Sequence, residues 1–180
     1  MRRLALLLLI LVDAGYVSGA WPYGFFEHDG LPPQGVVPSA AESLAIVVNR
    51  ANAVDNLSTA ELRRIFLGAR GHWPSGRRIT IVMMEPGQPE RAAVLRQICQ
   101  MSENEFSNHF LHGLFTGEVL VSPKILATPL GVRKFVFNVP GAIGYLRISD
   151  VDSSVKIVSI DERFPNEKTY ALHVTSPSVK

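Results

Sequence analysis

Apolar runs of strand length alternate with helix-type segments through most of this chain. Residues 44–48 (LAIVV) form a continuous apolar run of the kind found in a buried strand, and similar runs follow at 79–84, 142–147 and 156–160. Segments with helix start signals stand between these runs. Because strands separated by helices favour parallel pairing, the order predicts an α/β domain with a mostly parallel sheet flanked by helices.

Capping boxes and prolines mark where the helices begin. Ser58 with Glu61, and Ser102 with Glu105, place a serine before a helix and a glutamate three residues later, so that each side chain can bond the other's backbone N–H. Gly68 follows the first of these helices as its expected left-handed stop. Pro89 and Pro129 suit the first turn of two more. The predicted helices cover residues 59–67, 89–99, 102–114 and 129–138.

The first 20 residues have the pattern of a secretory signal peptide. Arg2 and Arg3 precede an apolar stretch at 4–12 that is too short for a membrane-spanning helix, which needs about 20 residues. The small residues Ser18, Gly19 and Ala20 form a cleavage site. We therefore expect a cut after Ala20, a periplasmic or secreted location, and no membrane span after cleavage.

Four segments follow from this pattern. They are a signal peptide at 1–20, a Pro/Gly-rich segment at 21–43, a single α/β domain at 44–174 and a tail at 175–180. The segment 21–43 is interpreted as a flexible linker, with the alternative that its aromatic side chains lie on the domain surface. Removing 20 of 180 residues leaves 160, enough for one domain with a real core.

The net charge and the single cysteine narrow the possible functional classes of this protein. The chain has 18 basic and 16 acidic residues and a net charge of +2, and two of the arginines lie in the leader. This near-neutral balance argues against nucleic-acid binding, which depends on dense positive charge. Cys99 cannot form an internal disulfide, and its neighbours Leu95 and Ile98 indicate a buried structural thiol.

Catalytic and metal-binding patterns are weak. The sequence has no nucleophile elbow, Ser-x-x-Lys pair, P-loop or dinucleotide fingerprint, so we expect no enzymatic activity and no cofactor. Glu105, His109 and His112 share one predicted helix face at the spacing of a partial metal site. Exposed polar residues on a helix explain the same pattern, and we predict no metal site.

Three segments together resemble the periplasmic phosphate-binding proteins of ABC transporters, the PstS-like proteins. They are 46–68 (IVVNRANAVDNLSTAELRRIFLG) followed by Trp73, the strand-loop-helix 79–95, and 140–146 (PGAIGYL). The helix end IFLG before a tryptophan and the PGAIGY turn are the most specific pieces. The resemblance implies a type II periplasmic-binding-protein-like fold, in which two lobes close on an anion. The predicted mature length leaves room for one lobe, so we expect a single-lobe module.

The resemblance also implies a ligand loop after the second strand. The family typically carries an arginine there, followed by Asp-Gly-Ser-Gly-Thr at a helix start, where backbone amides and hydroxyls hold an oxyanion. The matching stretch here is 84–91 (MEPGQPER), in which Gly87 keeps the turn. The positions of the arginine, serine, second glycine and threonine are taken by Met84, Gln88, Pro89 and Glu90. Pro89 lacks a backbone donor, and Glu90 brings a negative charge to the helix start.

The candidate ligand-binding residues are therefore Gly87, Gln88 and Arg91. The expected function is an exported, non-enzymatic solute-binding-protein-like module that takes phosphate or a similar small oxyanion in transport or sensing. The alternative is a structural or protein-interaction module that has lost ligand binding. Its free surface then takes an exported protein partner or a second copy of the chain.

Overall fold

The computed structural model describes residues 41–120 and 122–175. The predicted leader, nearly all of the Pro/Gly-rich segment and residues 176–180 lie outside the described part. The elements, in chain order, are β1 (Glu42–Asn49), β2 (Asn56–Leu57), α1 (Thr59–Phe66), β3 (Thr80–Met84), α2 (Pro89–Val94), the π-helix η1 (Leu95–Cys99), α3 (Glu103–Thr116), β4 (Lys124–Leu126), α4 (Pro129–Asn138), β5 (Ala142–Arg147), the 3₁₀-helix η2 (Ile148–Asp150), β6 (Val155–Ile160) and β7 (His173–Val174). None of the helices in these stretches has the length and apolar character that crossing a membrane requires.

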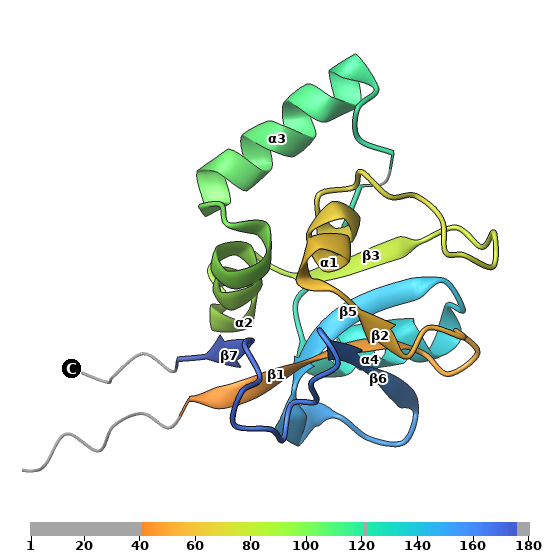
Figure 1. Cartoon of the computed structure of the whole chain (residues 1–180). Coiled ribbons are helices and arrows are strands. Elements are labelled where there is room, and N and C mark those ends of the chain that lie inside the picture. The colour runs from red at the N-terminus through yellow and green to blue at the C-terminus, as the bar shows by residue number, and fades with distance from the viewer. Residues whose placement is uncertain (1–40, 121, 176–180) are drawn as a thin grey trace, which may run out of the picture. The chain divides into compact units, whose positions relative to one another are not determined.

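One mixed sheet forms the centre of the domain (Figure 1). Its strand order is β2-β6-β1-β5-β3-β4, and β7 pairs with the start of β1. β3 runs parallel to β4 and β5, and β2 runs parallel to β6, whereas β1 is antiparallel to β5, β6 and β7. Six of the seven strands therefore share one direction, and β1 alone runs the other way. Because β1 is central, three of the six strand pairings are parallel and three are antiparallel, so the sheet is mixed.

The helix starts lie where the capping residues predict them. The Glu61 N–H donates to Ser58 Oγ at 3.2 Å, and the Ser58 N–H donates to Glu61 Oε2 at 3.0 Å. Ser102 and Glu105 make the same reciprocal pair at the start of α3. Gly68, just after α1, has a φ of 73°, the left-handed conformation expected of a helix stop. These local signals are confirmed.

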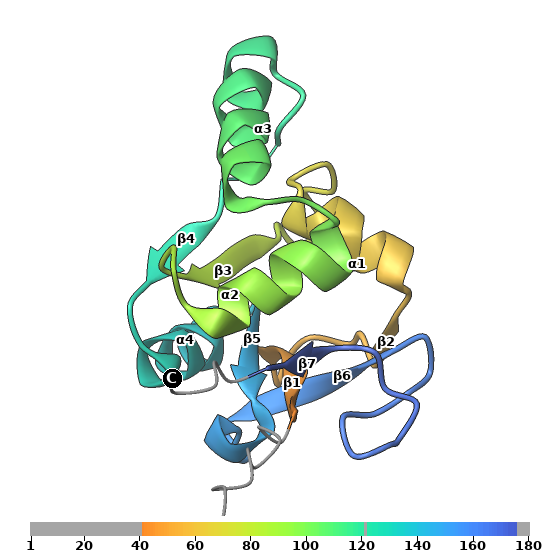
Figure 2. The same cartoon turned by 90° about the vertical axis from the view of Figure 1, so that its left-hand side faces the viewer.

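Helices cover both faces of the sheet. A Cβ on Gly144 in β5 would lie 3.1 Å from Val132 of α4, whereas the ring of the next residue, Tyr145, lies 6.1 Å from that of Phe66 in α1. Successive residues of a strand point to opposite faces, so α1 and α4 lie on opposite sides. Figure 2 shows α2 beside α1. The layers enclose a core on each face of the sheet.

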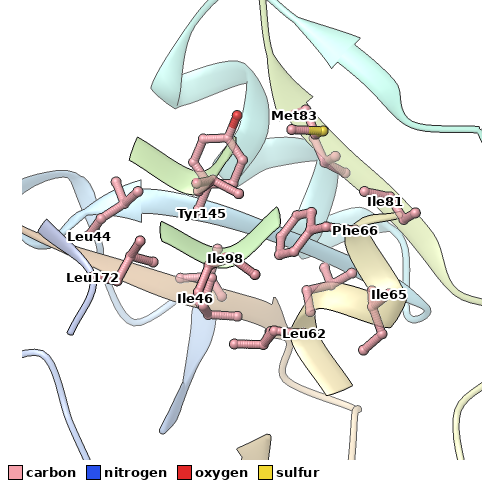
Figure 3. Close-up of a cluster of buried hydrophobic side chains, with 14 of the residues drawn as sticks. Leu44, Ile46, Leu62, Ile65, Phe66, Ile81, Met83, Ile98, Tyr145 and Leu172 are labelled. Carbon is pink, nitrogen blue, oxygen red and sulfur yellow. The ribbon is translucent and has the colours of Figure 1, made fainter. Parts of the chain in front are cut away.

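The core on the α1 side joins side chains from distant parts of the chain (Figure 3). The side chains of β1 meet those of α1, η1, β3 and β5 with almost no exposed surface. The labelled members are Leu44, Ile46, Leu62, Ile65, Phe66, Ile81, Met83, Ile98, Tyr145 and Leu172. Burying a large apolar side chain stabilises a fold by about 1.5–3 kcal/mol, so this cluster is a main source of stability.

Several boundaries differ from those expected. β1 begins at Glu42, two residues before the expected run, and β2 is a two-residue strand that was not predicted. The helix expected over 89–99 is α-helical to Val94 and continues as a π-helix to Cys99. Cys99 itself is buried, as predicted.

The PGAIGY turn is required by close packing at Gly141. A Cβ at this position would lie 2.1 Å from the carbonyl oxygen of Arg78, which is closer than any real contact. The Thr80 N–H also donates to the Gly141 carbonyl at 3.0 Å, and the indole of Trp73 donates to the same oxygen at 3.0 Å. Two pieces of the family resemblance, the tryptophan after IFLG and the PGAIGY turn, thus lie in one contact.

Candidate functional site

The candidate site lies where three strand ends meet. β3 ends at Met84 and leads into the loop before α2, and the parallel strand β5 ends at Arg147. β1 runs the opposite way, with Leu44 opposite Arg147, so its start at Glu42 lies at the same edge. In open α/β sheets ligands bind beyond the carboxyl ends of the parallel strands, which makes this edge the expected place for a ligand.

Gly87 and Gln88 form the turn of the predicted ligand loop. Gly87 has a φ of 90°, and no heavy atom would lie within 4 Å of a Cβ there, so the backbone is open to approach. Gln88 is the N-cap of α2, and its side chain makes no capping hydrogen bond. Its N–H donates to the Glu85 carbonyl at 3.3 Å. Pro89 occupies the first helical position and offers no N–H.

Arg91 ties α2 to the end of β3 and to the start of α3. It is only 4 % exposed, and its Nε and Nη2 donate to the two carboxylate oxygens of Glu103 at 2.8 and 2.6 Å. Its Nη1 donates to the Met84 carbonyl at 3.0 Å, and the guanidinium lies 5.3 Å from the ring centre of Phe106. The fork of Arg91 is therefore already engaged by a bidentate pair.

Glu90 makes a second ion pair on the other side of the loop. Arg147 Nε donates to Glu90 Oε1, and Arg147 Nη1 donates to Glu42 Oε2 at 3.0 Å. Ser149 donates its hydroxyl and its N–H to Glu42 Oε1. We call Glu42, Glu90 and Arg147 the edge network. It joins the start of β1, the start of α2 and the end of β5.

Hydrogen bonding favours the charged forms of Glu42 and Arg147. The hydrogen bond from the Ser149 hydroxyl holds the pKa of Glu42 below its usual value. The hydrogen bond to Glu90 raises the pKa of the Arg147 guanidinium. Glu90 is only 6 % exposed, and a buried carboxylate needs a partner of this kind. The network is thus a charged and paired group at the sheet edge.

Arg147 and Glu42 were missed by the sequence reasoning. Arg147 lies 57 residues from Glu90 and 105 from Glu42, so no local pattern connects them. The available signal was the place of Arg147 directly after the PGAIGYL strand, at the edge where ligands bind. Its position alone therefore marks Arg147 as a candidate ligand-binding residue.

An open hollow lies next to the loop on the side of α3. Its volume is about 640 Å³, and its lining includes Gly87, Arg96, Gln100, Glu103 and Glu105. Two carboxylates face one arginine there, so this hollow does not favour an anion. The predicted residues Gly87 and Gln88 thus share one turn, while Arg91 faces Glu103 in the neighbouring contact.

Neither Cys99 nor His109 adds a reactive group to this edge. Burial raises the pKa of Cys99 to about 12, so the thiol stays protonated at neutral pH. His109 Nε2 lies 2.9 Å from the Leu67 carbonyl oxygen and is used to hold α3 against the end of α1. Within residues 41–120 and 122–175, no three His, Cys, Asp or Glu side chains gather as a metal site requires.

Solved structures that match the fold include phosphate transport receptors and substrate-binding proteins. An ABC-type phosphate transport receptor from Vibrio cholerae matches with a TM-score of 0.59 and 24% identity, over 71% of this chain and 50% of that one. A putative phosphate ABC transporter substrate-binding protein with bound phosphate from Clostridium perfringens gives 0.64 and 22%, over 77% and 55%. PstS from Borrelia burgdorferi gives 0.58 and 13%, over 75% and 55%. No family model matches the chain.

The extent of these matches limits what is shared. This chain spans about half the length of the structures that it matches. At identities of 13 to 24%, the structural matches show a common fold and nothing more. The α/β class and the family-like order of strands and helices are confirmed by the matches. The described domain therefore has the fold of the phosphate-binding proteins of ABC transporters, over about half the length of those proteins.

Proposed function

We propose that this chain is an exported, non-enzymatic solute-binding-protein-like module that takes phosphate or a similar small oxyanion at the carboxyl edge of its sheet. Export rests on the predicted leader at 1–20, with the cut after Ala20, and places the protein in the periplasm or outside the cell. The module acts in transport or sensing as a single lobe formed by residues 44–174.

The observation that carries the proposal is the pair Arg147–Glu90. Arg147 lies at the carboxyl end of β5, and its counter-ion Glu90 belongs to the loop that matches the anion loop of the family. A guanidinium fork binds carboxylate and phosphate oxygens in the same way. The Glu90 carboxylate therefore occupies a place that a free oxyanion can also take, and the two compete for Arg147.

Gly87, Gln88 and Arg91, the three predicted residues, assist the replacement of Glu90 by an oxyanion at Arg147. The turn at Gly87 has no side chain to block an approaching anion. The side-chain amide of Gln88 makes no capping bond and is available as a donor. Arg91 contributes positive charge from within its pair with Glu103. Because Glu90 must leave Arg147 before an anion enters, we expect weak binding in the natural protein and tighter binding when Glu90 is neutral.

Thermal unfolding of the purified full chain tests the proposal. Phosphate and sulfate are titrated at constant ionic strength against chloride, because a ligand that binds only the folded state raises Tm. At ten times Kd we expect a rise of about 4 °C. Glu90→Gln should reach this rise at a lower phosphate concentration than the natural protein, and Arg147→Gln should abolish it.

The matched control is Asp55→Asn, which breaks the Lys156–Asp55 ion pair outside the candidate site and should leave the phosphate response unchanged. If neither the natural protein nor Glu90→Gln responds to millimolar phosphate or sulfate, the oxyanion proposal is wrong. The interaction module without a ligand then becomes the better description.

A further inference from the structure

Helix α3 extends beyond the body of the domain (Figures 1 and 2). Of its residues only Phe106, Phe110 and Gly113 are buried. One polar contact from its middle and one from the loop that follows it hold it to the end of α1. His109 Nε2 lies 2.9 Å from the Leu67 carbonyl oxygen, and the Leu120 N–H donates to the Gly68 carbonyl at 2.9 Å. Most of the helix surface is therefore open on the described domain.

The outer side of α3 is apolar toward its end. Leu111, Leu114 and Phe115 are 56, 58 and 85 % exposed, and Leu120 in the following loop is 57 % exposed. The first three are spaced three and four residues apart, so they share one helix face. We call these four residues the arm patch. A stripe of this kind on a helix normally lies against another apolar surface.

An open groove adjoins the arm patch. It has a volume of about 480 Å³ and is lined by Arg78, Thr80, Leu114, Leu120 and Ser122. Phe115 follows Leu114 in the helix, so a protruding ring and a groove lie next to each other on one surface. A two-fold arrangement of two identical surfaces can place each ring in the other's groove.

The charge of the arm patch also suits contact with a second copy of the chain. From Ser107 to Gly117 the chain contains no Asp, Glu, Lys or Arg. Two charged residues flank this stretch, Glu118 between Phe115 and Leu120, and Arg78 in the lining of the groove. They are opposite in sign, so two copies can meet along this face with Glu118 of one copy toward Arg78 of the other, which avoids the cost of like charges at an interface. We infer that the arm patch is a self-association surface, in which Phe115 of one copy enters the groove of a second copy. This inference is independent of the anion site, since none of these residues belongs to the edge network.

Sedimentation equilibrium of the purified full chain over a range of concentrations tests this inference. The natural protein should show a concentration-dependent dimer. Phe115→Gln keeps a helix-compatible side chain and removes the ring, and Leu120→Gln alters the groove. Each should weaken dimerisation at least tenfold, while far-UV circular dichroism stays unchanged. Phe137→Gln is the matched control, because Phe137 is an exposed ring on α4, and it should dimerise like the natural protein.

Three results would overturn the inference. The first is a natural protein that stays monomeric at every concentration. The second is a dimer that neither Phe115→Gln nor Leu120→Gln weakens, which would place the interface elsewhere. The third is a monomer that sediments with vesicles of phosphatidylethanolamine and phosphatidylglycerol and loses this binding in Phe115→Gln, which would assign the arm patch to a lipid surface.

Discussion

Glu90 and Arg91 are adjacent in the sequence, yet their side chains belong to two separate ion pairs. Glu90 bonds Arg147 toward the sheet edge, and Arg91 bonds Glu103 toward α3. Both residues are almost fully buried. Each charge therefore depends on a partner from a distant part of the chain, because a buried charge without a partner is strongly unfavourable.

The dependence of Arg91 on its partner leads to a prediction. Glu103→Ala leaves the buried guanidinium without a counter-ion. Removing one partner of a fully buried pair costs about 3 kcal/mol, and because the Glu103 side chain is 37 % exposed the expected cost here is about 2 kcal/mol. We expect the free energy of unfolding, measured by urea titration, to fall by about that amount. Asp55→Asn breaks a pair whose carboxylate is largely exposed and should cost less than about 1 kcal/mol. Equal losses in the two variants would contradict this account.

Residue-scale features were predicted where their cause is local. Ser58 and Glu61 are three residues apart, and their reciprocal bonds could be foreseen from the sequence. The turn at Gly87 was also foreseeable. The pairing of Arg147 with Glu90 depends on which strand lies beside which, and that information is absent from any short stretch of sequence.

Among the elements, α1 shows how a helix start becomes sensitive to acid. The hydrogen bond from the Ser58 N–H is the largest cause that lowers the pKa of Glu61 below its usual 4.5. A group whose pKa is lower in the folded state contributes stability above its unfolded pKa, and loses that contribution as the pH falls through the folded value. The capping box of α1 should therefore weaken in acid.

The corresponding experiment compares Glu61→Gln with the natural protein in urea titrations from pH 7 to pH 3. The variant should be less stable at pH 7, and the difference should shrink as the pH falls below about 4.5. Glu118→Gln alters an exposed carboxylate outside the helices and should match the natural protein throughout. A difference for Glu61→Gln that stays constant with pH would show that the carboxylate charge is not involved.

The elements that the sequence did not predict have physical reasons. β2 is two residues long and exists only because Asn56 and Leu57 lie opposite Ser159 and Ile160 of β6. The π-helical turn after α2 ends with Gln100 in the left-handed region, at a φ of 55°. A glycine, the usual sequence signal for this conformation, is absent at this position. Both features depend on tertiary contacts, whereas long apolar strands and capped helices can be recognised from the local sequence.

At the scale of the whole domain, stability should be distributed unevenly. β1 lies in the middle of the sheet and is fully buried from Leu44 to Val48, whereas the second half of α3 is mostly exposed. Amides open most easily where few apolar contacts protect them. Hydrogen exchange followed by mass spectrometry at low protein concentration should find β1 the slowest segment and residues 107–116 faster than α1. Equal protection of α3 and α1 would contradict this picture.

The reversed strand β1 has a consequence for the order in which the chain can fold. β1 is the first strand of the described domain, but its partners β5, β6 and β7 all lie beyond residue 141. During synthesis β1 must wait for nearly the whole domain before either of its edges is paired. Such long-range pairing delays folding. The central strand of the sheet is therefore made early and paired late, so a chain cut short before residue 142 would leave both edges of β1 unpaired.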